Sequence, residues 1–340
     1  MTPAVSILVP VYNVSNFIER CAHSLFQQTF EDIEYVFVND CTPDDSIEKL
    51  QKVMAQYPNR NVKIIHHEKN RGLAAARNTA IDHSTGKYIQ VIDSDDWVEA
   101  DMIENLYKKA EEEQADILVS DILMEKKNAT IYQKEFIEYK NKTPFQIMLE
   151  NEVIGGYLWA KFVKRELYVM PECRVIEGLN YLEDLHVSIR MFYFANKIVK
   201  IDRTFYHYNK TNENAITSQK TDSHFATLIV FWKYLDEFLQ ANSVKCAESI
   251  AFLKIHTKVN LITQTNSYKT RKKYAYLFRD FEMKYINRFR LGERLILFFT
   301  HYRMFFSAHL TYKLIILKNQ RIPKTLCTCK LSRQAGCAKT

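Results

Sequence analysis

The most constraining feature of this sequence is an alternation, over its first hundred residues, of short apolar runs with segments of helical periodicity. Apolar runs of the buried-strand type occur at Val5–Pro10, Tyr35–Val38, Val62–His66 and Tyr88–Ile92. Segments with apolar residues at helical spacing separate these runs. Strands that alternate with helices in this way are typical of βαβ units, in which helices cover a parallel sheet. The sequence therefore predicts an α/β fold with a mostly parallel sheet.

The rest of the chain follows a different pattern. Beyond about residue 100 the alternation ends, and beyond His224 only helical patterns remain, rich in Lys, Arg, Tyr and Phe. A chain of 340 residues can form one large domain or two ordinary ones. We expect residues 1–100 and 101–220 to be two halves of one α/β domain, and residues 221–340 to be a helical C-terminal extension.

Charge is distributed unevenly along the chain. Residues 1–225 contain 26 Lys and Arg against 34 Asp and Glu, whereas residues 226–340 contain 21 against 6, which gives net charges of −8 and +15. A basic region of this kind indicates an anionic partner, a membrane surface or a nucleic acid, or serves as a solubilising tail. No nucleic-acid-binding motif accompanies it, so we expect no nucleic acid partner. Basic residues mixed with aromatic and aliphatic ones over Arg290–Lys318 suit helices that lie on an anionic membrane, or a helical subdomain packed on the core.

Cysteine usage and hydropathy indicate where the protein works. The seven cysteines are irregularly spaced and suggest no disulfide framework. The N-terminus lacks the basic and apolar regions of a signal peptide. No uncharged apolar run reaches the roughly 18–20 residues that a transmembrane helix needs. We therefore expect a cytoplasmic protein that is peripheral on the inner face of the cell membrane.

Polar residues follow the apolar runs at the points where the predicted strands end. In an open parallel sheet, ligands bind outside the carboxyl ends of the strands. The residues at or just beyond these ends are Pro10 and Tyr12, Asp40, Arg71, and the acidic group Asp93, Asp95 and Asp96. Acidic and basic side chains that meet at one sheet edge suit a ligand made of metal and phosphate better than an apolar one.

The three aspartates within Asp93–Asp96 would repel one another unless a cation neutralises them. Carboxylate oxygens are ligands for Mg²⁺ and Mn²⁺, which in turn bind phosphate oxygens. The alternative is an acidic turn that caps a helix starting near Val98. No glycine precedes Gly72, so a dinucleotide-binding glycine motif is absent from the first strand, and a P-loop motif is absent as well. The sequence therefore favours a metal as the phosphate-binding element.

These segments, in their order and spacing, resemble the nucleotide-sugar-binding half of the family-2 glycosyltransferases. The resembling blocks are SILVPVYN (6–13), SLFQQTFEDIEYVFVND (24–40), NRGLAAARN (70–78) and GKYIQVIDSDDW (86–97). A second set resembles the family's acceptor-binding half, namely WAKFVKREL (159–167) and EGLNYLEDLHVSIR (177–190). The resemblance implies the GT-A fold, with the nucleotide sugar bound by residues 1–100 and the acceptor by residues 101–220.

The resemblance also implies roles in binding the nucleoside of the donor. Pro10, Tyr12 and Asp40 resemble the pocket for the base, where Asp40 would accept a hydrogen bond from a uracil N–H. Asp93 resembles the group that lies near the ribose. These roles together imply a UDP-sugar as the donor.

The resemblance assigns the metal and the diphosphate to a second group of residues. Asp95 resembles the metal ligand, with Asp96 beside it, and His207 is a candidate to complete the metal shell or else a packed histidine. Arg71 and Arg77 are candidates to hold the diphosphate or are charges on a helix surface. The implied cofactor is a divalent metal, Mn²⁺ or Mg²⁺.

The pair Glu183-Asp184 is the candidate for acid–base chemistry. An acceptor hydroxyl must lose its proton as it attacks the anomeric carbon, and a carboxylate beside another has a raised pKa. Two acidic residues near a helix N-terminus are the structural alternative. The resemblance implies that Asp184 is the catalytic base.

The implied reaction is an inverting transfer of a sugar from a UDP-sugar to a glycan or a lipid-diphosphate-linked saccharide in surface polysaccharide synthesis. The alternative is a catalytically silent nucleotide-sugar-binding or scaffold protein of a polysaccharide assembly complex. Asp40, Asp95 and Asp184 are all present, which favours the enzyme.

Overall fold

A computed structural model describes residues 2–135, 143–150, 155–179, 182–212, 222–264 and 268–321 of the chain. Residues 322–340, the end of the expected helical extension, lie outside these ranges. The chain forms two compact units, Met1–Cys246 and Ala247–Thr340. The first unit contains the sheet and also the first helix beyond residue 220, α8 (Asp222–Ala241).

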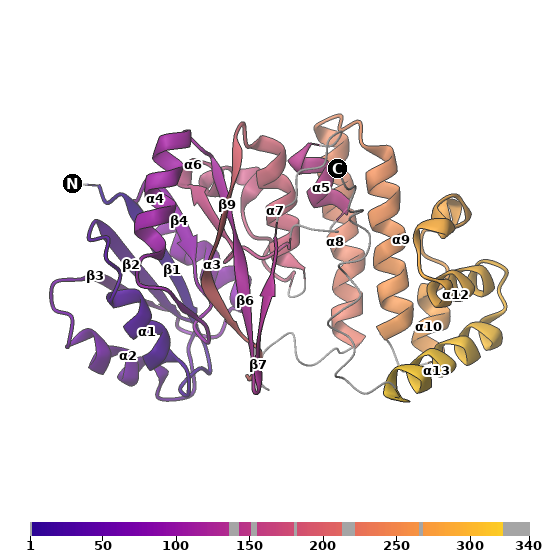
Figure 1. Ribbon diagram of the computed structural model, residues 1–340, viewed down its shortest axis with the longest axis horizontal. Helices are drawn as coiled ribbons and strands as arrows, with labels where there is room; N and C mark the ends of the chain where they lie inside the picture. The colour runs from indigo at the N-terminus through magenta and orange to yellow at the C-terminus, as the bar shows by residue number, and fades with distance from the viewer. Residues whose placement is uncertain are drawn as a thin grey trace, which may run out of the picture. The chain divides into compact units, whose positions relative to one another are not determined.

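The first unit combines strands and helices in alternation over its first third (Figure 1). Its strands are β1 (Val5–Val11), β2 (Ile33–Asn39), β3 (Asn61–His66), β4 (Tyr88–Val91), β5 (Trp97–Val98), β6 (Ile117–Lys126), β7 (Ala129–Gln133), β8 (Lys161–Lys164) and β9 (Ile198–Asn209). Its other helices are α1 (Ile18–Phe26), α2 (Ser46–Met54), α3 (Leu73–Asp82), α4 (Met102–Glu113), α5 (Pro144–Glu150), α6 (Arg165–Val169) and α7 (Glu183–Phe194).

The strands form one sheet in the order β3-β2-β1-β4-β8-β6-β9-β5, with β7 paired to β6. The four strands expected from the first hundred residues are present, and β3, β2, β1 and β4 are parallel to one another. Every residue of β1 is buried. A parallel strand with helices on both faces is buried throughout, which explains its continuous apolar run.

Two sets of helices bury the faces of this parallel part. Val5, Ile7 and Val9 belong to one core cluster with Ile18 and Leu25 of α1. Helix α3 packs against β1 and β2. It is rich in alanine, and these small side chains are buried against the sheet. The carboxyl ends of β1, β2 and β4 are therefore fixed by packing on rigid elements.

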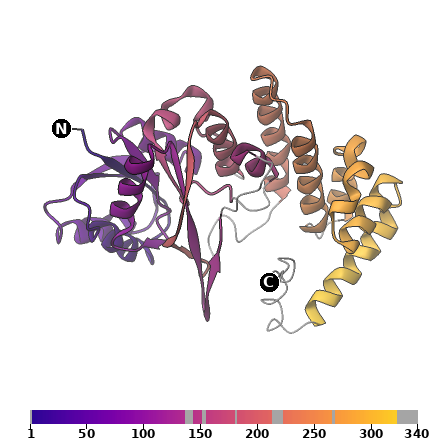
Figure 2. The ribbon, with the colours of Figure 1, turned by 45° about the horizontal axis from the view of Figure 1, so that its top comes forward.

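The second half of the sheet is mixed. Strand β8 is antiparallel to β4 and β6, while β9 is parallel to β6 and antiparallel to β5. The β5–β9 pairing sets Trp97 opposite His207 and Val98 opposite Tyr206. It thus brings the end of β9 to the acidic turn that follows β4. Strands β6 and β7 form a long hairpin (Figure 2).

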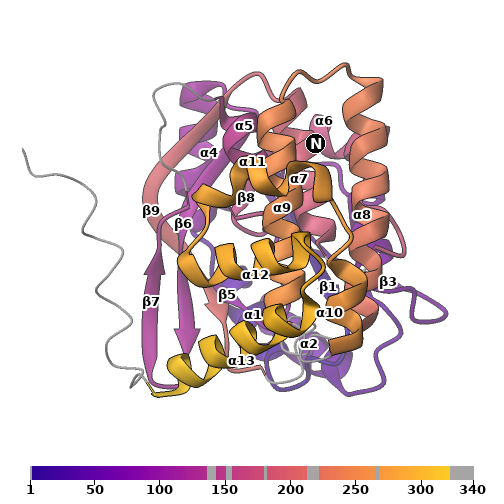
Figure 3. The ribbon, with the colours of Figure 1, turned by 90° about the vertical axis from the view of Figure 1, so that its right-hand side faces the viewer.

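The second unit is helical (Figure 3). Its α-helices are α9 (Ala247–Gln264), α10 (Tyr268–Tyr274), α11 (Glu282–Tyr285), α12 (Leu291–His301) and α13 (Phe305–Arg321). Phe252, Ile255 and Leu297 belong to its apolar cluster, and Lys258 forms a fully buried salt bridge with Glu282. Over the ranges that the structure describes, no helix combines the length and the apolar composition needed to cross a membrane.

Candidate functional site

One arginine joins three elements at the edge of the sheet where β1, β2 and β4 end. Nη2 of Arg77, on α3, donates to Oδ1 of Asp93, just beyond β4, over 3.0 Å. Nη1 of Arg77 donates to Oε1 of Glu183 over 3.1 Å and also contacts Asp184 Oδ1. Glu183 and Asp184 open α7, more than one hundred residues further along the chain. The structure thus brings together Arg77, Asp93 and Asp184 among the predicted site residues.

Arg77 is buried, with a side chain only 2% exposed. Burial lowers the pKa of its guanidinium, but the carboxylates of Asp184, Asp93 and Glu183 outweigh this effect and raise it. The arginine is therefore permanently charged, and its partners are held by charge-assisted hydrogen bonds. Arg77 does not lie on a helix surface, and its two terminal nitrogens are already engaged by carboxylates.

The two carboxylates at the start of α7 have an unusual electrostatic environment. Burial raises the pKa of Glu183 to about 7, and the neighbouring charge of Asp184 adds to the effect. Burial also raises the pKa of Asp184, against the opposing influence of Arg77. A coupled pair that releases a proton near neutral pH can accept one from a substrate hydroxyl.

The backbone before α7 is strained at the position that delivers this pair. Leu182 has φ of +63° in the left-handed region, which branched and bulky residues rarely adopt. Such conformations persist only where the surroundings enforce them, and they cluster at functional sites. The strain directly precedes Glu183 and Asp184.

A loop from residue 155 to residue 158 holds Asp184 from its other side. The backbone N–H of Leu158 donates to Asp184 Oδ2 over 3.4 Å. The buried Lys161 donates to the carbonyl oxygens of Gly155 and Tyr157, each over 2.6 Å. Burial lowers the pKa of Lys161 to about 8. A buried cation thus fixes the loop that contacts Asp184.

Close packing also ties this loop to α7. A Cβ atom on Gly156 would lie 2.7 Å from Leu185 Cβ and 2.8 Å from its Cα. The hydroxyl of Ser188 donates to the Gly156 carbonyl over 2.8 Å. Only glycine permits this approach of the loop to the first turns of α7, because the nearest atoms include backbone.

The acidic turn after β4 is held by the end of β9. Asp96 is fully buried, and its two oxygens accept from the hydroxyl of Tyr206 and the backbone N–H of Asn209, each over 2.7 Å. Asp95 Oδ2 accepts from the side-chain amide of Asn212 over 2.8 Å. The hydroxyl of Tyr206 also accepts from the Asp93 N–H over 3.1 Å. Asp96 therefore shapes the turn from within.

The carboxylates of this turn suit a divalent cation as a partner. Burial and the neighbouring Asp93 raise the pKa of Asp95, which means that its negative charge is poorly compensated. A bound cation would lower this cost, and oxygen donors are what Mg²⁺ and Mn²⁺ prefer. Within the described ranges no group of three or more His, Cys, Asp or Glu side chains has metal-binding geometry. Mg²⁺ typically takes one or two carboxylates plus substrate phosphates, which fits Asp95 as a protein ligand.

Asp40 organises the loop that leads into α3. Its Oδ1 lies 2.7 Å from His67 Nδ1 and accepts from the Arg71 N–H over 2.8 Å. Its Oδ2 accepts from the Gly72 N–H over 2.7 Å. Gly72 has φ of +88°, a conformation that glycine adopts at no steric cost. The structure thus gives Asp40 a structural role at the sheet edge, beside any contact with a base.

The remaining predicted residues occupy different settings. Pro10 is buried in β1, and Tyr12 follows that strand with 46% of its surface exposed. The Arg71 side chain is half-exposed and pairs with Glu177 over 3.3 Å. The ring nitrogens of His207 lie 2.8 Å from Glu125 and 2.9 Å from Glu99, so the structure gives His207 these partners rather than Asp95.

Sequence reasoning missed several residues of this site. They are His67, Leu158, Lys161, Tyr206, Asn209 and Asn212. The aromatic-rich segment FYHYN (205–209) forms the end of β9, and its pairing with β5 is a long-range contact that no local pattern reports. The available signal for Lys161 was a lysine within the otherwise apolar run Leu158–Val163.

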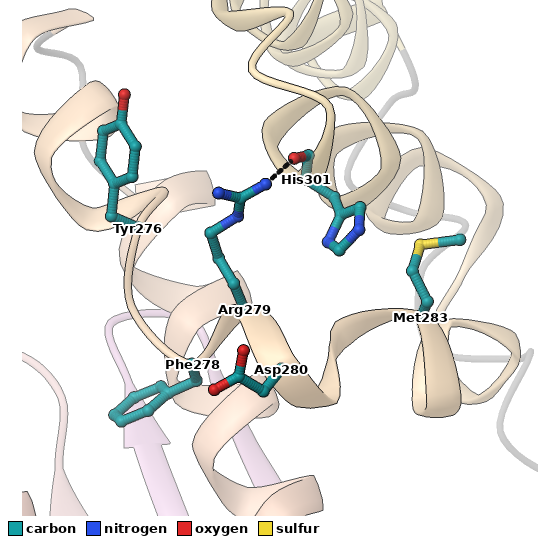
Figure 4. Close-up of a pocket in the computed structure, with 6 residues that line it drawn as sticks. All are labelled: Tyr276, Phe278, Arg279, Asp280, Met283 and His301. Atoms are coloured by element: carbon teal, nitrogen blue, oxygen red, sulfur yellow. Dashed lines mark hydrogen bonds between the residues drawn. The ribbon is translucent and has the colours of Figure 1, made fainter.

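Two hollows lie outside the cluster of Arg77, Asp93, Glu183 and Asp184. The larger has a volume of about 670 Å³ and belongs to the second unit (Figure 4). Its lining residues are Tyr276, Phe278, Arg279, Asp280, Met283 and His301. Another, of about 470 Å³, lies between α1 and the segment around β5, where Arg20 stacks on Trp97. Neither is lined by a residue of the carboxylate–arginine cluster.

Comparison with known proteins identifies the family. The family model described as Glycosyl transferase family 2 matches residues 6–168. The EpsH protein of Bacillus subtilis strain 168 is 30% identical over 283 residues, which cover 79% of this chain and 78% of EpsH. This chain belongs to glycosyltransferase family 2. Glycosyltransferase EpsJ of the same strain is 34% identical over 224 residues, and the match spans 64% of this chain and 64% of EpsJ, less than two thirds of that relative.

A solved structure supports the fold of this family-2 glycosyltransferase. TarS of S. aureus, in complex with UDP-GlcNAc, superposes with a TM-score of 0.72 and 19% sequence identity, covering 94% of this chain and 92% of that one. Because the identity is low, the likeness shows the fold alone. The prediction of an α/β, GT-A fold with a helical C-terminal extension is confirmed. The family match contains Asp40, Arg77 and Asp95, whereas Asp184 and His207 lie beyond it.

Proposed function

We propose that this glycosyltransferase transfers a sugar, with inversion, from a UDP-sugar to a glycan or a lipid-linked saccharide in surface polysaccharide synthesis. The observation that carries the proposal is the Arg77 cluster, which fixes Asp93 and Asp184 on opposite sides of one guanidinium. A donor near Asp93 would then lie close to the carboxylate that deprotonates the acceptor. A relative with this fold binds UDP-GlcNAc, which supports a UDP-linked donor.

The donor site is proposed from the residues at the sheet edge. Tyr12 is exposed beside the buried Pro10, and a base can lie against its ring. Asp40 fixes the loop that leads into α3 through the backbone N–H groups of Arg71 and Gly72. The exposed guanidinium of Arg71, rather than the buried Arg77, is free to turn from Glu177 toward a diphosphate.

Metal dependence is proposed for the acidic turn. Asp95 would hold a divalent metal, Mn²⁺ or Mg²⁺, which supplies positive charge beside the leaving diphosphate when bound. Asn212 orients one oxygen of Asp95. Asp96 is buried below the turn and fixes its shape, and His207 is engaged elsewhere, so we place neither in direct contact with the metal.

Base catalysis is proposed for Asp184. Arg77 and the Leu158 N–H fix its two oxygens. Burial and the neighbouring charge of Asp93 raise the pKa of Asp184. A hydroxyl that approaches Asp184 from the acceptor side can transfer its proton as it attacks the anomeric carbon. A single displacement of this kind inverts the anomeric centre, and it needs no covalent bond to the protein.

The proposed setting is the inner face of the cell membrane, with the protein attached peripherally. Its basic C-terminal region would meet an anionic surface, where a lipid-linked acceptor is found. The net charge of +15 over residues 226–340 supports this attachment.

The test is release of UDP from a panel of UDP-sugars, with Mn²⁺ and a mixture of oligosaccharide and lipid-linked acceptors. Asp184→Asn should reduce acceptor-dependent release by ~10³-fold or more while UDP binding remains. Asp202→Asn, on an 80% exposed surface carboxylate, is the matched control and should retain wild-type turnover. Tight UDP binding without turnover on any donor would favour the alternative, a catalytically silent binding or scaffold protein.

A further inference from the structure

Helix α12 presents a continuous apolar stripe to solvent. Leu291, Leu295, Phe298 and Tyr302 recur at spacings of four, three and four residues, and they are 73%, 40%, 40% and 56% exposed. This spacing places all four on one face of a helix. The opposite face of α12 supplies buried residues to the second unit's core, Leu297 among them. The helix therefore buries one apolar face and leaves a second one in solvent.

Helix α13, which packs against α12, repeats this arrangement (Figure 3). Phe306, Leu310 and Leu314 recur at spacings of four residues and are 74%, 50% and 58% exposed. Met304, in the turn between the helices, is 46% exposed. Soluble proteins rarely expose apolar patches of this extent unless the patch is a site of interaction.

Beyond Glu293 in the first turn of α12, the charged residues of these two helices have one sign. No Asp or Glu occurs after Glu293, whereas nine Lys and Arg follow it. Arg303 and Lys313 are exposed within the same two helices and their connecting turn. Arg303 has φ of +61°, and the backbone N–H groups of Arg303 and Met304 donate back to α12. The turn thus holds a cation and an apolar side chain at a fixed tip.

We propose that this surface binds an anionic lipid bilayer. It comprises the exposed side chains of α12, α13 and their turn, hereafter the α12–α13 face: Leu291, Leu295, Phe298, Tyr302, Arg303, Met304, Phe306, Leu310, Lys313 and Leu314. The apolar side chains enter the boundary between headgroups and acyl chains, and Arg303 and Lys313 meet lipid phosphates. This inference names the surface behind the attachment in the proposed function, and it rests on that function only for the presence of a lipid-linked acceptor.

Charge complementarity favours a bilayer over a second copy of this chain as the occupant. Two copies joined through the same face would bring Arg303 and Lys313 of each copy together. The α12–α13 face carries no carboxylate with which these cations could pair. An anionic bilayer provides a phosphate for each cation and an apolar layer for the leucine and phenylalanine side chains.

The test is sedimentation of the full chain with vesicles of phosphatidylcholine alone, or with one third phosphatidylglycerol. We expect binding to the anionic vesicles, and at least ~10-fold weaker binding to the neutral ones. The double variants Phe306→Ser/Leu310→Ser and Arg303→Gln/Lys313→Gln should each weaken anionic-vesicle binding by ~10-fold or more. Ile229→Ser is the matched control, a 48% exposed apolar residue of α8, and should bind as wild type.

Three results would overturn the inference. They are equal binding to both vesicle types, unchanged binding by both double variants, and a dimer in solution that the same substitutions dissociate. UDP release with a water-soluble acceptor is measured in parallel on every variant and should be unchanged. A variant that loses vesicle binding but still transfers the sugar shows that the α12–α13 face acts in membrane binding and not in catalysis. A wild type that binds vesicles but transfers no sugar contradicts the proposed function and leaves the inference about the face intact.

Discussion

Arg77 and Asp93 form a salt bridge of 3.0 Å between the middle of α3 and the end of β4. The guanidinium is almost completely buried, and its other terminal nitrogen binds the carboxylates that open α7. Separating this guanidinium from its carboxylates would leave buried charges unpaired, which is energetically costly. The ion pairs therefore hold the two halves of the first unit together at the proposed reaction site. Arg77 is in this account a positioning residue, and Asp184 is the base that it positions.

Arg77→Lys is the first test of this positioning. The lysine keeps the charge but loses the fork that binds Asp93 and the α7 carboxylates together. We expect kcat to fall by ~100-fold, because Asp184 is no longer held in place. We also expect the midpoint of the pH–rate profile to move to higher pH, because Arg77 lowers the pKa of both Glu183 and Asp184 and an ammonium without the fork contacts fewer of these carboxylates. Arg203→Lys, in an exposed pair with Asp101, is the control. An unchanged pH profile in Arg77→Lys would refute the positioning role.

The wild-type pH dependence follows from the pair at the start of α7. Burial raises the pKa of Glu183 to about 7, so the pair gains a proton as the pH falls below that value. We expect kcat/KM to rise with pH up to about 7 and then to level off. A profile that is flat from pH 5 to pH 8, with chemistry limiting the rate, would argue against base catalysis by this pair.

The same shift predicts a pH dependence of stability. The folded protein binds the Glu183 proton more tightly than the unfolded chain does, so protonation favours the folded state and its contribution is lost as the pH rises through about 7. Glutamine does not ionise, so Glu183→Gln should not lose this contribution to folding stability as the pH rises. We expect the decrease in Tm between pH 5.5 and pH 8 to be smaller in the variant by ~3 °C or more. An equal decrease in both proteins would show that Glu183 ionises normally.

Gly156→Ala tests the loop that contacts Asp184. The added methyl group would meet Leu185 at its Cα and Cβ, so the loop or the first turn of α7 must shift. We expect kcat to fall by ~10–100-fold, because the shift would displace Asp184 at the start of α7. Affinity for UDP should be nearly unchanged, because the substitution lies beside α7 and not beside the proposed nucleotide-binding residues. Calorimetry with UDP and steady-state kinetics separate the two effects. A parallel loss of UDP affinity would mean that the loop also shapes the donor site.

The sequence predicted the parallel part of the sheet well, because buried strands are marked locally by apolar runs. It also placed Asp93 correctly at the end of β4. It did not predict that Arg77 is buried among carboxylates 16 to 107 residues away, since periodicity reports burial but not the partner of a charge. The unbroken alanines before Arg77 were the available signal, because they mark a helix buried on both sides.

The antiparallel half was harder to predict for a related reason. Tyr206 and Asn209 shape the acidic turn only because β9 pairs with β5, a two-residue strand that no apolar run announces. Likewise, the resemblance left His207 as either a residue of the metal shell or a packed histidine, while its orientation follows from Glu99, Glu125 and the stacked ring of Trp97. These arrangements depend on tertiary register, which local patterns do not encode.

The most direct test of the central claim is calorimetric binding of UDP, with GDP for comparison, in Mn²⁺ and then in excess chelator. The proposed site predicts that wild-type protein binds UDP more tightly than GDP, that chelator weakens UDP binding by ~10-fold or more, and that Asp95→Asn behaves like chelated wild type. Folded wild-type protein that binds neither nucleotide, with or without Mn²⁺, would contradict the account of this site as a nucleotide-sugar-dependent transferase.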